Sequence, residues 1–415
     1  MLAVLHMAQY FPAVFVGAAL PYLFRKEGLA LNLFWLLAIP GYTRFFKFLL
    51  ALLVDRYSFS RLGRRKSWII PCTIIGVLSY LSLSFFPPDV QWIYVIVAIL
   101  TFKSLVMAAQ DIAVDAYAAE SMTDEERPLG TSLINCLAGI AGAIGFAAVA
   151  IVEAFNWATA MVVASLLLIM AALPAVVRDE PPPPRAALIK KKDLDFSALK
   201  SMRWSLFRRD SWYILPFMFF FGFGGSLGPT MIPAFWADQS LTTTQYAVLS
   251  ASAAIAGGVL AIFTVPWLAN RIGLRKNAMI GLIVVPIQAA MYIIFSLMED
   301  LPAMPTILLS YILIAWAVAH YGHSVSISRF RWVSKAQAGT DYAVQSSVWN
   351  LGVVSAATMS GFIATWTGAE SGNWTGFFVI SASVIVCAGL FYILVFDKIE
   401  KSVVEREREE MAESV

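Results

Sequence analysis

Charged and amide side chains occur inside an apolar stretch of this chain, at spacings that allow them to act together. Residues 101–120 read TFKSLVMAAQDIAVDAYAAE and include Lys103, Gln110, Asp111 and Asp115. On a helix, Lys103 and Gln110 are nearly eclipsed, whereas Asp111 and Asp115 lie four residues apart on a neighbouring strip. Cationic and amide groups can bind an anion, and a buried carboxyl can carry a proton. The stretch predicts one polar stripe that faces an internal cavity.

Two further cations could join this stripe. Arg44 and Lys47 are three residues apart, so they share a helix face. With Lys103 they predict a cationic lining that attracts an anionic solute, in which Arg44, Lys103 and Gln110 are candidate substrate contacts. Internal ion pairs that hold the helices together are the alternative. Asp111 is accordingly either the proton-coupling carboxyl or the partner in such an ion pair. Lys47 lies nearer the inner surface, and its long side chain can extend toward that surface.

Candidate binding and proton-transfer residues recur in three other apolar stretches. His320 and His323 share a face and titrate near physiological pH, so they are candidates for proton coupling, with a hydrogen bond to a neighbour as the alternative. His6, Gln9 and Tyr10 stand on one face of the first stretch, and Gln9 and Tyr10 are candidate substrate contacts. Gly225 lies in GFGGSLGP, which predicts either a bend around a binding site or close helix packing.

Acidic and basic residues near the inner ends of these stretches predict a cytoplasmic gate. Asp55 and Asp115 are predicted near the inner surface, at the level of the sequence LGRRK of residues 62–66. We expect them to pair with its basic residues and to separate when the inner mouth opens; these residues are Arg64, Arg65 and Lys66. Asp341, in the sequence GTD, is assigned either to this gate or to capping the helix that begins there.

Membrane-spanning helices are the elements that must position these residues. Of the 415 residues, 59% are apolar or aromatic and only 14% are charged, with a mean hydropathy of +0.73. A soluble domain has about 25% charged residues. One crossing of a bilayer needs about 20 apolar residues. Such runs predict twelve crossings, near residues 3–24, 30–54, 67–87, 91–119, 129–153, 156–177, 212–236, 243–269, 277–298, 303–333, 341–366 and 374–396.

The distribution of Lys and Arg predicts that both termini are cytoplasmic, because short loops rich in these residues stay inside. The predicted outer loops hold just Arg25 and Lys26, and the inner loops hold the other loop cations. The first residues show no basic leader and no small-residue cleavage site, so we expect a first crossing there. The three cysteines lie within apolar runs, so we predict that they pack against their neighbours: Cys72, Cys136 and Cys387.

A repeat divides the chain into two halves around a long polar interruption at residues 178–211. Gly63 and Lys66 recur as Gly273 and Lys276 at an offset of 210, and the sequence beginning at Gly130 recurs at an offset of 209. Six crossings in each half make the repeat parallel. We predict an N-terminal six-helix bundle at 1–177, a cytoplasmic linker at 178–211, a C-terminal six-helix bundle at 212–397 and a cytoplasmic tail at 398–415.

Several stretches resemble the AmpG-type branch of the major facilitator superfamily, which includes muropeptide permeases, siderophore importers and the acetyl-coenzyme A transporter. They are FKFLLALLVDRY, LGRRKSW, QDIAVDAY, DEERPLGTS and AGTDYAVQSS. The resemblance implies an all-α polytopic membrane protein with twelve transmembrane helices in two six-helix bundles. Muropeptide permeases tend to carry two extra crossings and a charged stretch in the seventh segment, where this chain reads FFFGFGGSLGP. This difference favours the siderophore-importer type.

The leading hypothesis is a proton-coupled secondary transporter that imports a medium-sized organic anion, such as a siderophore, by alternating access. A muropeptide permease and an acyl-CoA-type transporter are alternatives, and a membrane-embedded acyltransferase using His320 is an alternative of another class. No ATP-binding Gly-Lys-Ser/Thr loop occurs, so a gradient must supply the work. We expect no enzyme activity, cofactor, metal or nucleic-acid partner. The expected setting is a monomer in the inner (plasma) membrane, with protons, a small solute and lipid as partners.

Overall fold

The computed structural model describes residues 2–57, 63–121, 127–177, 203–334 and 338–413. Within these ranges some side chains fall outside the description, among them those of Gln9, Asp55, His323 and residues 118–139. All regular elements in the described part of the chain are helices. The predicted all-α polytopic fold is therefore confirmed.

The first half supplies six crossings. The first runs through α1 (Leu2–Val14), the π-helix η1 (Phe15–Ala19) and α2 (Leu20–Lys26), and the second through η2 (Leu31–Leu33), α3 (Trp35–Tyr42) and α4 (Lys47–Arg56). Four long helices complete the bundle: α5 (Lys66–Leu83), α6 (Ile93–Ser121, after the short η3, Val90–Trp92), α7 (Arg127–Ala154) and α8 (Trp157–Val177).

The second half also supplies six crossings, each a single helix. They are α10 (Ser211–Asp238), α11 (Thr243–Ile272), α12 (Leu274–Ser296), α13 (Met304–Trp332), α14 (Ala338–Trp366) and α15 (Thr375–Glu413), with η6 (Ala369–Ser371) before the last. Most helices begin and end within a few residues of the predicted spans, because the length of an apolar run fixes where a lipid-spanning helix can end.

Two elements differ from the predicted spans. The last helix continues to Glu413, well past the predicted end at residue 396, so the predicted boundary at 397 falls inside α15. The second crossing is interrupted between α3 and α4. Pro40 has no N–H to donate, the Thr43 hydroxyl donates to the Pro40 carbonyl at 2.8 Å, and residues 43–46 form turns.

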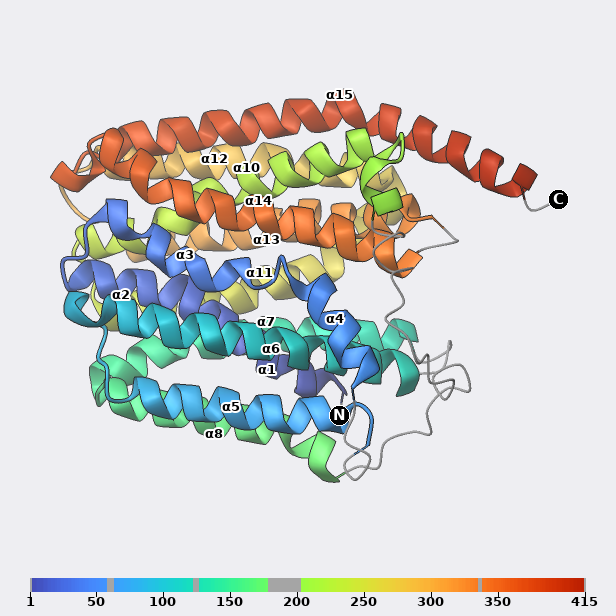
Figure 1. Cartoon of the computed structure of the whole chain (residues 1–415). Coiled ribbons are helices and arrows are strands. Elements are labelled where there is room, and N and C mark those ends of the chain that lie inside the picture. The colour runs from blue at the N-terminus through green and yellow to red at the C-terminus, as the bar shows by residue number, and fades with distance from the viewer. Residues whose placement is uncertain (1, 58–62, 122–126, 178–202, 335–337, 414–415) are drawn as a thin grey trace.

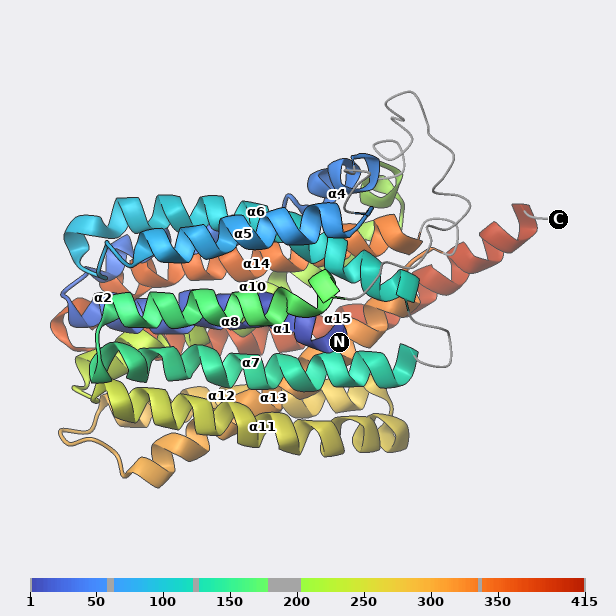
Figure 2. The same cartoon turned by 90° about the horizontal axis from the view of Figure 1, so that it is seen from below.

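The two halves pack side by side, with the blue-to-green first half and the yellow-to-red second half in separate bundles (Figure 1). Helix α7 packs on α11, α3 packs on α14, and α2 packs on α10. Figure 2 shows α7 beside α11 from a second direction. We call the end of the bundle with Leu2 and Glu413 the terminal end, and the opposite end, with residues 27–30, the sealed end.

The apolar cores differ between the two ends. A large cluster at the sealed end combines residues of both halves, for example Phe24 and Leu31 with Phe235 and Trp374. Toward the terminal end the clusters separate: one contains residues of the second half only, such as Phe217, and another contains residues of the first half only, such as Ile69. The halves therefore share a core at the sealed end and have separate cores at the terminal end.

Candidate functional site

A central cavity of about 260 Å³ lies between the two halves. Its first-half wall comes from η1, the second crossing and α6, and its second-half wall comes from α14. The lining residues are Gly17, Leu37, Ala38, Pro40, Gly41, Arg44, Lys47, Lys103, Ser104, Met107, Ala108, Asp111, Asn350, Val353, Val354 and Ala357. Three of them are cations and one is a carboxylate, so the cavity carries an excess of positive charge.

Arg44 is the exposed cation of this cavity, and the interruption of the second crossing presents it. It lies in the turn after α3, about halfway between Leu31 and Arg56, where its backbone N–H donates to the Gly41 carbonyl at 3.2 Å. Its side chain is exposed to the cavity. Among the described residues, no carboxylate lies within ion-pair distance of its guanidinium. An arginine side chain stays protonated, so this charge is available to a solute.

Lys47 lies between two carboxylates of α6. Its ammonium bonds Asp111 and lies 4.0 Å from an oxygen of Asp115, whose other oxygen is 3.1 Å from the His6 ring. Asp111 lines the cavity, whereas the Asp115 side chain is 58% exposed toward the terminal end. The four side chains thus form a chain of titratable groups that leads away from the cavity.

Lys103 and Gln110 both donate to hydroxyl groups of α5, as two nearly eclipsed positions on α6 should, but of the two it is Lys103 that also lines the cavity. Lys103 lines the cavity but is nearly buried; it donates to the Tyr80 hydroxyl at 3.0 Å and lies 4.5 Å from the centre of that ring. Gln110 is fully buried and donates to Thr73 of α5 at 3.1 Å. The stripe on α6 that reaches the cavity therefore contains Lys103 and Asp111 but not Gln110.

The candidates in the tenth and seventh crossings lie inside the second half. His320 is fully buried between α11, α12 and α13, where its ring nitrogens lie 2.8 Å from Asn277 and 3.0 Å from Thr264. Gly225 packs against the hydroxyl of Tyr321, and α10 runs without a break through the glycine-rich stretch. In the structure these glycines allow close helix packing and do not introduce a bend.

Tyr10 is 40% exposed on α1 and lies within electrostatic range of Asp111 and Arg44, which line the cavity. The Gln9 and His323 side chains lie outside the described residues, as does that of Asp55 in the predicted gate. Arg65 is buried beside the start of α5, and Arg64 and Lys66 are half-buried there.

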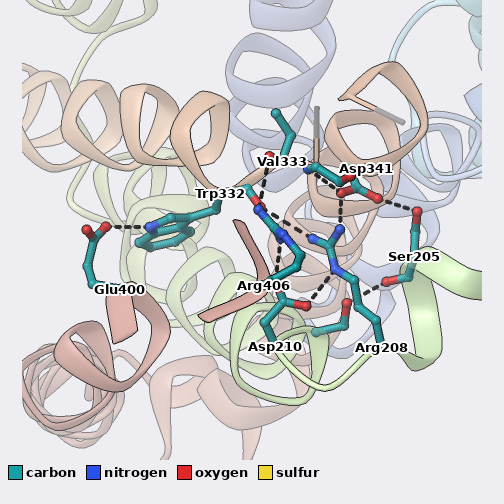
Figure 3. Close-up of polar contacts among 10 residues, drawn as sticks. Ser205, Arg208, Asp210, Trp332, Val333, Asp341, Glu400 and Arg406 are labelled. Carbon is teal, nitrogen blue, oxygen red and sulfur yellow. Dashed lines mark hydrogen bonds and ion pairs between the residues drawn. The ribbon is translucent and has the colours of Figure 1, made fainter. Parts of the chain in front are cut away.

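Asp341 belongs to a buried polar cluster at the terminal end of the second half (Figure 3). It accepts hydrogen bonds from Ser205 and Arg208 and from the Ser334 amide. Arg406 of α15 bonds Asp210 and donates to the carbonyls of Trp332 and Val333, at the end of α13. These described partners of Asp341 are two side chains and an amide that precedes α14, so its assignment to a helix cap or to the gate stays a prediction.

The sealed end contains an ion-pair cluster that the sequence analysis did not identify. Arg25 donates to both oxygens of Asp238, at 2.6 and 3.0 Å, and to Glu370 at 3.0 Å. The rings of Tyr22 and Tyr246 stack with centroids 4.2 Å apart. Arg25 was treated only as a topology signal, although isolated Asp238 and Glu370 in the matching loops of the other half could have suggested a pair.

Two six-helix bundles around a polar cavity, with a shared core at one end and separate cores at the other, are the architecture of a membrane carrier. The chain belongs to the Major Facilitator Superfamily, whose family model matches residues 2–240 and 218–414. It is therefore a transporter and not an enzyme, and its twelve crossings form the fold of this family.

Solved transporters have the same fold at low sequence identity. The D-xylose-proton symporter superposes with a TM-score of 0.72 at 14% identity, covering 94% of this chain and 95% of that one. A bacterial homologue of the human lysosomal transporter Spinster, in an inward-facing and occupied conformation, gives 0.69 at 13% identity, covering 95% of each chain. The nucleoside transporter NupG gives 0.68 at 16% identity, covering 95% of this chain and 98% of that one.

Curated relatives match a shorter stretch. The anhydromuropeptide permease of Escherichia coli K12 is 28% identical over 134 residues, which is 32% of this chain and 27% of the permease. An uncharacterised protein of Haemophilus influenzae is 33% identical over 121 residues, 29% of this chain and 28% of that protein. The matches thus span little more than a quarter of these relatives and support the AmpG-type branch.

Proposed function

We propose that this protein is a proton-coupled importer of an organic anion, which binds in the central cavity against Arg44. The observation that carries the proposal is the exposed guanidinium of Arg44, which has no carboxylate partner among the described residues. A charge at mid-bilayer costs about 3 kcal/mol even on insertion scales, so an arginine near the middle of a crossing, with no counter-ion among the described residues, favours a role in binding. Lys103 adds a second basic side chain to the same cavity.

Asp111 and Lys47 are the proposed coupling pair. An anion that enters beside Arg44 also approaches Lys47, and competes with Asp111 for its ammonium. Asp111, once released, is free to take up a proton, and the proton leaves toward the terminal end when the pair forms again. Asp115 and His6 continue the polar chain in that direction. His320 is left out of this scheme because its described partners lie within the second half.

The terminal end is the proposed cytoplasmic end, as the positive-inside rule predicts for both termini. Separate cores at this end and a shared core at the other support a conformation that faces inward. We retain the inner (plasma) membrane, a monomeric state and domain boundaries at 177 and 211 as parts of the proposal. We also retain a gate in which Asp55 and Asp115 pair with Arg64, Arg65 or Lys66.

Uptake into proteoliposomes tests the proposal. The probes are labelled organic acids, a ferric siderophore and an anhydromuropeptide, each with and without an imposed pH gradient. We expect a pH gradient, acid outside, to drive uptake of an anionic probe, and Arg44→Gln to lower this uptake about tenfold, since a hydrogen bond to a charged group contributes about 1.5–3 kcal/mol. Asp111→Asn should leave any residual uptake indifferent to the gradient.

The matched control is Arg209→Gln, which removes a surface arginine whose side chain is 84% exposed. Its uptake should equal that of the unaltered protein. Equal uptake in Arg44→Gln would contradict the anion site, and uptake that ignores the gradient in the unaltered protein would contradict proton coupling.

The short match to anhydromuropeptide permeases favours a muropeptide as a second candidate substrate. This candidate predicts uptake of the anhydromuropeptide probe in preference to the siderophore. The reverse preference would support the siderophore.

A further inference from the structure

The charges of the central cavity gather on one wall. Arg44, Lys47, Lys103 and Asp111 come from the second crossing and α6, all in the first half. The facing wall is α14, which contributes Val353, Val354 and Ala357 and the single amide of Asn350. Across its width the cavity therefore passes from a cationic surface to an apolar one.

The two walls meet closely beside the charged groups. A Cβ atom placed on Gly41 would lie 2.9 Å from a methyl group of Val354, and the Tyr42 and Thr358 hydroxyls are 2.9 Å apart. A solute that contacts Arg44 is consequently within reach of the α14 surface. A polyhydroxylated acid would leave its hydroxyls unpaired against Val353 and Ala357, at a cost of about 1–3 kcal/mol for each buried group.

The volume sets the size of the solute. Ligand sites commonly measure about 300–1,000 Å³, and this cavity, at about 260 Å³, lies just below that range. In the conformation described here, such a volume accommodates a compact acid.

We propose that the cavity selects a compact amphipathic organic acid, whose carboxylate pairs with Arg44 and whose apolar body rests on Val353, Val354 and Ala357 of α14. This inference rests on the proposed anion transport. It adds that the opposite wall discriminates between apolar and polar acids of similar size.

Binding of three probes to the purified full-length protein, measured by titration calorimetry, tests this inference. The probes are 4-phenylbutyrate, its neutral amide 4-phenylbutanamide, and gluconate, a polar acid of similar size. We expect 4-phenylbutyrate to bind about tenfold more tightly than either of the other two, a difference of about 1.4 kcal/mol.

Two variants test the two walls of the cavity separately. Arg44→Gln should abolish the preference for the acid over the amide. The double variant Val353→Thr/Val354→Thr keeps the shape of α14 but adds hydroxyls. It should therefore reduce the preference for 4-phenylbutyrate over gluconate. The preference for 4-phenylbutyrate over its amide should stay unchanged. Thermal unfolding of each variant verifies that it is folded.

The outcomes distinguish this inference from the proposed function. Gluconate binding as tightly as 4-phenylbutyrate would overturn the amphipathic selection and leave the anion site standing. Equal binding of the acid and its amide would overturn the anion site itself. Binding of none of the three probes would overturn the inference, since 4-phenylbutyrate meets all its requirements of charge, size and apolarity.

Discussion

At the scale of single residues, Lys47 and Asp111 are predicted to stabilise each other. Their side chains are about three-quarters buried and form a direct ion pair. Removing either charge leaves the other without its partner, so Lys47→Gln and Asp111→Asn should each lower the thermal unfolding midpoint. The double variant should recover part of the loss, with a coupling free energy of about 0.5–3 kcal/mol.

Thermal unfolding in detergent measures these midpoints. Additive losses in the double variant would show that the pair does not form. Transport gives an independent readout, because the double variant should remain uncoupled from the pH gradient even where its stability recovers.

Spacing along the chain predicted part of the candidate site. Lys103 and Asp111 line the cavity as the stripe on α6 required, and Arg44 lies there too. Gln110 faces α5 as Lys103 does and is fully buried there, whereas Asp111, turned by about 100° from Gln110, reaches the cavity. The contact between Lys47 and Asp111 joins the second and fourth crossings, and no spacing in one segment can reveal a distance between two.

At the scale of helices, the contact between α10 and α14 depends on glycine. A Cβ atom on Gly222 would lie 2.6 Å from the carbonyl oxygen of Trp349, which is backbone and cannot move aside easily. We predict that Gly222→Ala lowers the thermal unfolding midpoint, since forcing extra atoms into a packed interface costs about 1–3 kcal/mol.

Gly258→Ala is the matched control, because a Cβ atom there would meet nothing within 4 Å. It should leave the midpoint unchanged or raise it, since alanine favours a helix over glycine by about 1 kcal/mol. Equal effects of the two substitutions would contradict the close packing of α10 on α14.

The attachment of helix α15 to the second half is predicted to depend on Arg406 but not on Arg408. Arg406 is buried on Asp210 and on two carbonyls at the end of α13, whereas Arg408 is exposed. Removing one partner of a buried pair costs about 3–5 kcal/mol, so Arg406→Ala should destabilise the second half and Arg408→Ala should not. Limited proteolysis of the region after residue 397 measures the difference, and equal cleavage rates would contradict the prediction.

The helices could be predicted more completely than their interruptions. Apolar length determines a crossing, and that length is visible in the sequence. The turn at residues 43–46 depends on Pro40 and on a local hydrogen bond from Thr43, and the extension of α15 depends on burial of Ile399, Val403 and Arg406 against the bundle. Such tertiary contacts stabilise the helix beyond residue 397 although the sequence there is rich in charged residues.

At the scale of the whole molecule, Arg25 is predicted to hold the sealed end closed. Its guanidinium donates hydrogen bonds to Asp238 and Glu370, and both acids belong to the other half. Arg25→Gln should therefore favour conformations in which the halves separate at this end; a loss of about 1.4 kcal/mol shifts the equilibrium tenfold.

Spin labels at Gln91 and Glu299 measure this opening, since both side chains are exposed and belong to sealed-end loops of different halves. The three native cysteines are first replaced by alanine. We expect a single distance distribution in the parent protein and an added longer distance in Arg25→Gln. An unchanged distribution would contradict the prediction, and Arg408→Gln serves as the control.

The uninterrupted run of α15 has a practical consequence for microscopy. Residues 397–413 extend it by about 25 Å at 1.5 Å per residue, and Arg406 fixes this extension to the second bundle. A small rigid protein fused in helical register after Glu413 would turn with that bundle. It would act as a fiducial for image alignment, and its tilt would report the rocking of one half against the other.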